Sequence, residues 1–423
     1  MTPLTADDPS VPSPLDRSGQ PRPDHEIDRT VALAEDLLTR RSGARVRLAD
    51  AEDLGGSTRS RVVRVRVAEN PFSLPRTLVV KHYLAAPEAA PIAGHERVDP
   101  FPYEAASCQL FTALPAEDRA TPTLYANDPE QRLLVLEDLG RCSSVADKLD
   151  GDDPKAAERA LLGAARALGS LQAVTAAREG DFGALLRRSG VRHWRDPLAD
   201  DARSALAELP DLLAHLLRVE AAPAAVAQAR SAAGLLGGTH YRAFSPSEVS
   251  PENCLLTGAG ARFLDFEWGC FRDVALTAAS VRLPFPGWGR PAVLPTGMAE
   301  AMTAAWQSEV AGVWPELADL AVSGPRHLAA TTLWVWVCTR SLLPVVVDRG
   351  TVPEQVVVGR PPEHAAAVLA SYWRRLRTDA ERQRVEATAE LADAVVAALE
   401  PYGGDEPLPF FPAFARCTRG QEA

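Results

Sequence analysis

The hydrophobic pattern of this chain changes its period near residue 140, and this change limits the folds that the chain can adopt. Before that point, five short apolar stretches predict strands, at residues 45–54, 60–67, 77–83, 121–125 and 132–136. After it, apolar residues recur at helical spacing over most of the remaining length. Strands gathered in one part and helices in another predict an α+β fold with a small β-rich part and a larger helical part.

The same pattern predicts the domains. Residues 1–25 are rich in Pro, Asp, Ser and Thr and predict a disordered tail. We expect an N-lobe over 26–137, with helices at 24–43 and 101–114 beside its strands. A helical C-lobe should fill 138–423, with helices near residues 154–175, 202–218, 222–236, 297–322, 325–345, 361–378 and 380–399.

Composition narrows the possible partners. The 423 residues carry a formal charge of −11 and no long basic block, which argues against binding nucleic acid through its phosphates. The longest apolar run, near residues 328–338, is closed by Arg340 and is shorter than a membrane span, so we expect no membrane partner. The start of the chain lacks the pattern of a signal peptide, and we therefore expect a cytoplasmic protein.

A β-hairpin predicted inside the helical part is the first indication of chemistry. Two short apolar strands, 254–256 and 262–264, enclose a turn at 257–260. Polar residues flank both ends of this hairpin: Glu248 and Asn253 precede it, and Asp265 and Glu267 follow it. Carboxylate and amide oxygens are the hard ligands that suit Mg²⁺ bridging phosphates.

The spacing of these residues is that of a kinase catalytic loop and metal loop. Glu248 stands five positions before Asn253, and Asp265 follows twelve positions later. In that arrangement the first acid orients or deprotonates the acceptor hydroxyl, while the Asn and the later Asp hold the magnesium ions on the nucleotide. The spacing predicts Glu248 as the catalytic acid and Asn253 and Asp265 as metal ligands.

The upstream part of the chain carries the other features that phosphoryl transfer needs. A turn with Gly55, Gly56 and Ser57 could lay backbone N–H groups over phosphates. Lys81 lies in an apolar strand that would present its ammonium group to those phosphates, and Glu104 opens the next helix, where it could pair with Lys81. The break at 137–140, from Glu137 through Leu139, is where a hinge would offer backbone groups to an adenine ring.

These motifs resemble those of the aminoglycoside phosphotransferase and choline-kinase-like small-molecule kinases over roughly residues 26–400. The matching motifs are Leu-Val-Val-Lys, the Glu of Pro-Tyr-Glu-Ala-Ala, Leu-Val-Leu-Glu-Asp-Leu-Gly, Ser-Pro-Glu-Asn-Cys-Leu-Leu and Phe-Leu-Asp-Phe-Glu. The resemblance implies a bilobal protein-kinase-like fold that uses ATP and Mg²⁺ to phosphorylate a hydroxyl. It also implies that Lys81 contacts the α and β phosphates, that Glu104 holds Lys81, and that Glu267 supports a second metal ion beside Asn253 and Asp265.

The chain departs from the family at the catalytic loop. Family members read His-Gly-Asp where this chain reads Pro246-Ser247-Glu248. Glu keeps the charge but adds a methylene group, and a misplacement of about 1 Å can cost on the order of 100-fold in rate. Two hypotheses therefore stay open: an active kinase that uses Glu248, and a pseudokinase that binds nucleotide or a partner without transferring phosphate. A helical scaffold with a vestigial N-lobe is a third.

The acceptor also stays open. An insertion at residues 178–238 and the helices after residue 297 should line the acceptor cleft, as the resemblance implies. Aminoglycoside-like cations, amino alcohols and Ser or Thr of a biosynthetic peptide all fit a small-molecule or peptide acceptor with a hydroxyl. The motifs do not distinguish ATP from GTP.

Overall fold

The structure is a computed structural model that describes residues 23–56, 60–70, 74–84, 99–246, 249–283, 285, 290–348 and 364–415. Three of the sequence predictions fall outside these residues. They are most of the tail expected at residues 1–25, the phosphate contact of Ser57 and the catalytic acid Glu248.

The chain divides into two compact units by its internal contacts. The first combines Met1–Ala89 with Thr123–Asp138, and the second combines Ala90–Pro122 with Leu139–Ala423. Residues 90–122, which we expected in the N-lobe, have their contacts in the second unit. The physical reason is visible in α2 (Phe101–Thr112), where the ring of Phe111 packs against Phe244 and Phe266 of the helical part, at centroid distances of 4.7 and 5.1 Å.

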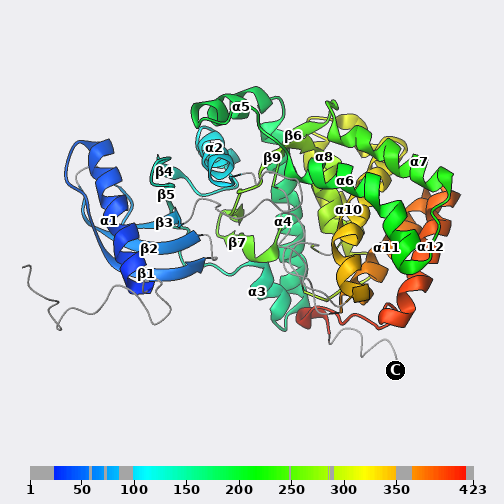
Figure 1. The fold of residues 1–423 in the computed structure, drawn as a ribbon. Coiled ribbons are helices and arrows are strands. Elements are labelled where there is room, and N and C mark those ends of the chain that lie inside the picture. Colours follow the sequence, from blue (N-terminus) through cyan, green and yellow to red (C-terminus); the bar gives the residue numbers. More distant parts are fainter. Residues whose placement is uncertain are drawn as a thin grey trace, which may run out of the picture. The chain divides into compact units, whose positions relative to one another are not determined.

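The first unit is a five-stranded antiparallel sheet with one helix across a face (Figure 1). The strands lie in the order β1-β2-β3-β5-β4, with bounds β1 Arg47–Gly56, β2 Ser60–Glu69, β3 Thr77–Tyr83, β4 Leu124–Asp128 and β5 Leu133–Glu137. Helix α1 (Pro23–Ser42) ends at Gly43, whose φ of 70° is a left-handed conformation that glycine adopts without strain.

The alternating pattern of the strands determines which side chains face α1. Leu78 and Val80 of β3 are fully buried against Ala34 and Leu38 of α1. His82, two residues further along β3, bonds through its Nδ1 to the Thr30 hydroxyl of α1 at 2.9 Å. Successive residues of a strand point to opposite faces, so Val79, Lys81 and Tyr83 lie on the face away from α1.

The second unit is mainly helical. Besides α2, its helices are α3 Val145–Asp150, α4 Pro154–Thr175, α5 Glu179–Arg188, α6 Pro197–Leu212, α7 Pro223–Ala232, α8 Val274–Arg282, α9 Met298–Val310, α10 Leu320–Asp348, α11 Ala365–Arg382 and α12 Glu386–Leu399. Two short antiparallel ribbons interrupt them: β6 (Arg242–Ser245) pairs with β9 (Cys270–Asp273), and β7 (Cys254–Thr257) pairs with β8 (Gly260–Phe263). The predicted α+β class is confirmed, and so is the predicted hairpin.

Helix α10 forms the centre of the helical core and packs against α6, α8 and α11 (Figure 1). Trp334 and Trp336 are fully buried, and the indole N–H of Trp334 donates to the Leu276 carbonyl of α8 at 2.7 Å. Residues 320–347 are long and apolar enough to cross a membrane by length and composition. However, 72% of their most apolar 18-residue stretch is buried within the protein, as is typical of the core helix of a globular unit.

Some predicted helices have different bounds. The helix expected at 297–322 ends as α9 at Val310, and the next residues form a turn and a short 3₁₀ segment, Pro315–Ala318. Pro315 has no N–H and disfavours a helical conformation at Trp314, which explains the break. Helices α5 and α8 and the β6–β9 ribbon were not predicted, and each of them is short.

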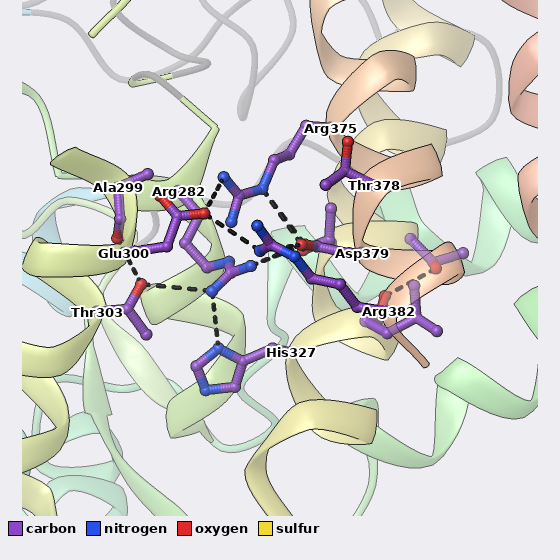
Figure 2. Close-up of polar contacts among 12 residues, drawn as sticks. Arg282, Ala299, Glu300, Thr303, His327, Arg375, Thr378, Asp379 and Arg382 are labelled. Atoms are coloured by element: carbon purple, nitrogen blue, oxygen red, sulfur yellow. Dashed lines mark hydrogen bonds and ion pairs between the residues drawn. The ribbon is translucent and has the colours of Figure 1, made fainter. Parts of the chain in front are cut away.

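A buried ionic network joins α8, α9 and α11 within the helical unit (Figure 2). Arg282 of α8 donates from Nη2 to both carboxylate oxygens of Asp379 of α11, at 2.8 and 2.9 Å. Arg375 of α11 contacts both Asp379, at 3.3 Å, and Glu300 of α9, at 3.0 Å. Arg382 also reaches Glu300, at 3.2 Å. Arg282 and Asp379 are buried, and their burial is tolerated because each has an opposite charge beside it, whereas Glu300 and Arg382 are partly exposed.

His327 of α10 lies against this network on the side of Arg282. Its ring is 8% exposed, and its Nδ1 lies 3.4 Å from Nη1 of Arg282. Burial, aided by the positive charge of Arg282, lowers the pKa of His327 to about 4, although the Asp379 carboxylate opposes this shift. Other charged groups that act on the ring are Arg375 of α11 and Arg326 of α10 itself. His327 is therefore neutral in the folded protein at pH 7.

We expect His327 to make the protein less stable as pH falls from about 6.5 to about 4. The unfolded chain takes up a proton at His327 near its usual pKa of 6.5 and the folded protein does not. The loss reaches about 3 kcal/mol below this range. Urea unfolding of His327→Gln should show a flatter fall in unfolding free energy over this range than the wild type. The exposed His193→Gln should keep the wild-type slope, and equal slopes in all three proteins would contradict the assignment.

Candidate functional site

The β7–β8 hairpin brings Asn253 close to Asp265. Its strands pair in register from Cys254 with Phe263 to Thr257 with Gly260. At the open end, the Leu264 N–H donates to the Asn253 carbonyl at 2.8 Å. Asn253 therefore lies opposite Leu264, and Asp265 is the next residue along the chain. The two residues predicted as metal ligands share the open end of the hairpin.

The backbone of Asn253 is held by short-range hydrogen bonds. It ends a 3₁₀ turn, η4 (Pro251–Asn253), in which the Asn253 N–H donates to the Ser250 carbonyl at 3.0 Å. The next residue, Cys254, is buried, and burial raises the pKa of its thiol to about 12. The thiol thus stays protonated at neutral pH, so Cys254 anchors the turn and does not supply a nucleophile.

Asp265 has a backbone conformation that is uncommon for a residue with a side chain. Its φ of 62° lies in the left-handed region, where Cβ crowds the following carbonyl. This turn directs Phe266 into an aromatic cluster with Phe111 and Phe244, at centroid distances of 5.1 and 5.8 Å, while Asp265 stays exposed. Non-glycine residues in such conformations cluster at functional sites.

Glu267 follows in a tight turn that close packing stabilises. The Gly269 N–H donates to the Phe266 carbonyl at 3.0 Å, and Glu267 is half-buried. A Cβ on Gly269 would lie 2.3 Å from the ring of Phe244, so only glycine fits there. The aromatic cluster and this glycine fix the turn that carries Glu267.

The donor set at the open end of the hairpin fits magnesium by its chemistry. An amide oxygen of Asn253 and carboxylate oxygens of Asp265 and Glu267 are hard donors. Within the described parts of the chain, no group of three or more His, Cys, Asp and Glu side chains gathers to hold a metal ion. The predicted set consists of the carboxylates of Asp265 and Glu267 and the amide of Asn253. Such a set suits Mg²⁺, which keeps several waters and shares its remaining positions with substrate phosphates.

In the first unit, Gly55 and Gly56 form the end of β1. The Gly55 N–H donates to Oδ1 of Asp53 at 2.8 Å. Gly56 has a φ of 142°, and a Cβ there would lie 2.2 Å from the Ser60 carbonyl oxygen. The chain needs glycine at Gly56 to let β1 and β2 approach each other. A Cβ on Gly55 would meet nothing within 4 Å, so the close approach requires glycine at Gly56 only.

Lys81 lies in the middle of β3 and is buried. Its register partners are Val62 of β2 and Leu134 of β5, which places it in the centre of the sheet. Its Nζ is 5.2 Å from the ring centroid of Tyr83, a distance typical of a cation–π contact. The contact of Lys81 with the nucleotide phosphates, which the Leu-Val-Val-Lys motif predicts, stays a prediction.

Glu104 lies in the first turn of α2, which begins at Phe101, and is 2% exposed. A carboxylate at a helix N-terminus is stabilised by the helix dipole. Its predicted ion pair with Lys81 would join the two units and stays a prediction.

The chain passes from the first unit to the second between Asp138 and Leu139. Glu137 Oε2 accepts hydrogen bonds from the N–H and hydroxyl of Thr123, at 3.0 and 2.9 Å, so its side chain holds β4 to β5. The Leu139 carbonyl accepts from the thiol of Cys142 at 3.2 Å. The predicted nucleotide contacts of Glu137 and Leu139 would thus come from the backbone and stay predictions.

Two arginines, one in each unit, have structural roles that the sequence did not indicate. Arg64 of β2 donates to both carboxylate oxygens of Asp138, at 2.9 and 3.1 Å, and so holds the residue before the crossing. Arg272 of β9 is 1% exposed and bonds to three separate segments. Neither residue belongs to a recognisable motif, and an arginine in a strand is usually read as surface, so the sequence carried no signal for them.

Comparisons with known proteins give matches only among solved structures. A scan against protein-family models finds no match, and a search of curated proteins finds none. A choline/ethanolamine kinase family protein from Mesorhizobium loti is 15% identical, with 81% of this chain and 92% of that chain covered at a TM-score of 0.45. Choline kinase LicA from Streptococcus pneumoniae is 13% identical, with 84% and 98% covered at a TM-score of 0.45.

A thermostable mutant of aminoglycoside phosphotransferase APH(4)-Ia also aligns. That structure is a ternary complex with ADP and hygromycin B. It is 14% identical, with 86% of this chain and 97% of that chain covered at a TM-score of 0.39. The chain is similar to these small-molecule kinases at low identity, and its α+β fold follows from its own sheet and helices.

The left-handed backbone of Asp265 gives a test at this residue. Without nucleotide or metal, Asp265→Gly should be more stable than Asp265→Ala by about 1 kcal/mol, because glycine adopts a positive φ without strain. At the exposed helical residue Glu390, the same pair should show the opposite order, since glycine destabilises a helix. Urea unfolding measures both pairs. The same order at both positions would contradict a strained backbone at Asp265.

Proposed function

We propose that this protein is an ATP- and Mg²⁺-dependent phosphotransferase that transfers the γ-phosphate to a hydroxyl of a small molecule or peptide. The observation that carries the proposal is the meeting of Asn253 and Asp265 at the open end of the β7–β8 hairpin, with Asp265 in a left-handed backbone. Phosphoryl transfer needs positioned oxygen ligands and charge neutralisation more than covalent chemistry, and this arrangement supplies the ligands.

The first unit would bind the nucleotide phosphates. Lys81, buried in the centre of the sheet, would place one positive charge on the α and β phosphates. The backbone N–H groups of Gly55, Gly56 and Ser57 would lie over the phosphates, and Glu104 would hold the Lys81 ammonium. The backbone at Glu137 and Leu139 would bind the adenine ring. These contacts are proposals, inferred from the position and chemistry of each residue.

In the second unit, Asn253 and Asp265 would hold Mg²⁺, and Glu267 would support a second ion. When bound, the metal neutralises charge that develops on the transferring phosphate. The protein's own part is to keep these side chains in place. The bond from Leu264 to Asn253 and the burial of Phe266 do so before any ligand arrives, which reduces the reorganisation needed at the reaction.

Glu248 would orient the acceptor hydroxyl or accept its proton. The segment that leads to it is well anchored: Ser245, the last residue of β6, is fully buried, and its hydroxyl accepts from Gln172 of α4 at 3.1 Å. Fixed support on this side would help a Glu side chain reach a consistent position despite its extra methylene group. The proposed acceptor is a small molecule or a peptide that carries a hydroxyl group.

The alternative is a pseudokinase that binds nucleotide or a partner protein without phosphoryl transfer. The observation that favours it is the sequence Pro246-Ser247-Glu248, in which the acid is a Glu. Both functions share the nucleotide and metal residues, so only turnover separates them. We propose the active enzyme because Asn253 and Asp265 lie together at the open end of the hairpin, which supports a role in holding metal.

The test is turnover of ATP by the purified protein with Mg²⁺ and a panel of hydroxyl acceptors: aminoglycosides, amino alcohols and Ser/Thr peptides. We expect acceptor-stimulated ADP formation that falls on the order of 100-fold or more in Asp265→Ala, because a fixed group that stabilises the developing charge is lost. Asp393→Asn, which removes an exposed helical carboxylate paired with Arg377, should keep wild-type turnover.

The same assay with Glu248→Asp separates the two functions. An unchanged or lower rate would show that Glu248 is the working acid in a site built for its length. A large gain over a nearly inactive wild type would support the pseudokinase. Tight nucleotide binding without turnover on any acceptor, in the wild type and in Glu248→Asp, would contradict the enzyme.

A further inference from the structure

Arg272 is a fully buried arginine at the centre of the candidate site's supports. It lies in β9, and its side chain is 1% exposed. A guanidinium group always carries its charge in proteins and has five N–H donors in a fixed plane, so its burial is costly unless its donors are satisfied. Here the charge is balanced by Asp196, whose carboxylate accepts from Nε at 2.9 Å and from Nη2 at 2.6 Å.

The remaining donors of Arg272 bind backbone carbonyls of two other segments. Nη1 donates to the Ser245 carbonyl at 2.8 Å, and Nη2 donates to the Trp268 carbonyl at 2.9 Å. The guanidinium nitrogens Nε, Nη1 and Nη2 thus each donate to at least one acceptor. The planar group fixes the relative positions of Asp196, Ser245 and Trp268, because its donors point in set directions.

These three acceptors stand at the ends of the functional segments. Ser245 is the residue directly before Pro246-Ser247-Glu248, and Trp268 directly follows Asp265-Phe266-Glu267. Asp196 caps α6, where its carboxylate also accepts from the Leu198 N–H at 3.1 Å. Helix α6 lies in the insertion at 178–238 that we expected to line the acceptor cleft. One side chain therefore joins the segments of the candidate acid, the metal ligands and the acceptor.

Pro246, the described residue that follows Ser245, cannot replace this connection. Pro246 has neither a backbone N–H nor a polar side chain, so it cannot donate to the metal segment. The last paired residues of β6 and β9 are Ser245 and Cys270, so this ladder does not extend to Pro246. Beside that pairing, the hydrogen bonds of Arg272 tie the Ser245 carbonyl directly to the Trp268 carbonyl.

We propose that Arg272 is a positioning residue that sets the distance between Ser245, which leads into the predicted catalytic loop, and the metal segment, and couples both to helix α6, which is expected to line the acceptor cleft. This role rests on the proposed phosphotransferase function. Because Arg272 is buried, it would not touch nucleotide or acceptor. Its loss should therefore lower the rate of the bound complex more than the affinity for ATP. A shift of about 1 Å between the segments would cost on the order of 100-fold in rate.

The test separates positioning from simple stability. Arg272→Met alone leaves the Asp196 carboxylate without its counter-charge, so this variant should unfold more easily. In Arg272→Met with Asp196→Asn that charge is gone, and Asn can still cap α6. The double variant should regain most of the lost thermal stability but keep a kcat about 100-fold below wild type, with KM for ATP within about threefold. Arg272→Lys should recover part of the kcat, because it restores one charged donor.

The matched control is Arg242, in the other strand of the same ribbon, where its register partner is Asp273, the residue after Arg272. It binds Glu179 at 2.6 and 2.9 Å and the Phe271 carbonyl at 2.7 Å, but neither functional segment. Arg242→Met should lower thermal stability and keep kcat within about threefold, since the loop ends stay tied. A double variant with wild-type stability and wild-type kcat would overturn the proposal, as would an equal loss of kcat in Arg242→Met.

A second readout does not depend on turnover. Amide hydrogen exchange at Asn253, Leu264 and Gly269, whose N–H groups bond within the two segments, should be at least tenfold faster in the double variant than in the wild type and in Arg242→Met. Unchanged exchange would overturn the positioning role. If the wild type transfers no phosphate to any acceptor, the proposed function fails, and the exchange data alone decide whether Arg272 ties the segments.

Discussion

The hydrogen bond from the Leu264 N–H to the Asn253 carbonyl determines the geometry on which the candidate site depends. It extends the β7–β8 ladder by one step and so places two ligand side chains at one end of a short hairpin. A four-residue strand pair is too small to be stable alone, so it relies on what surrounds it. Cys254 and Phe263 are buried on one side, and Phe266 lies in the aromatic cluster beyond the end.

Polar side chains then fix what apolar packing leaves free. Hydrophobic contacts hold elements together without a strong direction, whereas a guanidinium group binds its acceptors at fixed angles. The chain uses this property repeatedly: Arg64 holds Asp138 at the crossing between the units, Arg272 joins the loop ends, and Arg282 holds Asp379 between helices. Each pair is largely buried, where an ordered geometry matters more than the modest energy of an ion pair.

Much of the fold and the central part of the site could be predicted from the sequence, because both rest on local patterns. Alternation indicated the strands, and the acid and amide flanking a predicted hairpin indicated Asn253 and Asp265. The missed parts depend on distant partners. Arg272 could not be recognised because Asp196, Ser245 and Trp268 come together only in the fold. Likewise, α2 shows no sign in its sequence that its Phe111 packs with the helical unit.

The most direct test of the account is whether nucleotide and a divalent metal ion bind together at Asn253 and Asp265. Mn²⁺ can replace Mg²⁺ at oxygen ligands and is detected by electron paramagnetic resonance. Titration of Mn²⁺ into the wild-type protein with a non-hydrolysable ATP analogue should show a site that forms only with the nucleotide and disappears in Asn253→Ala with Asp265→Ala. A wild type without such a site, or a site that persists in the double variant, would contradict the account.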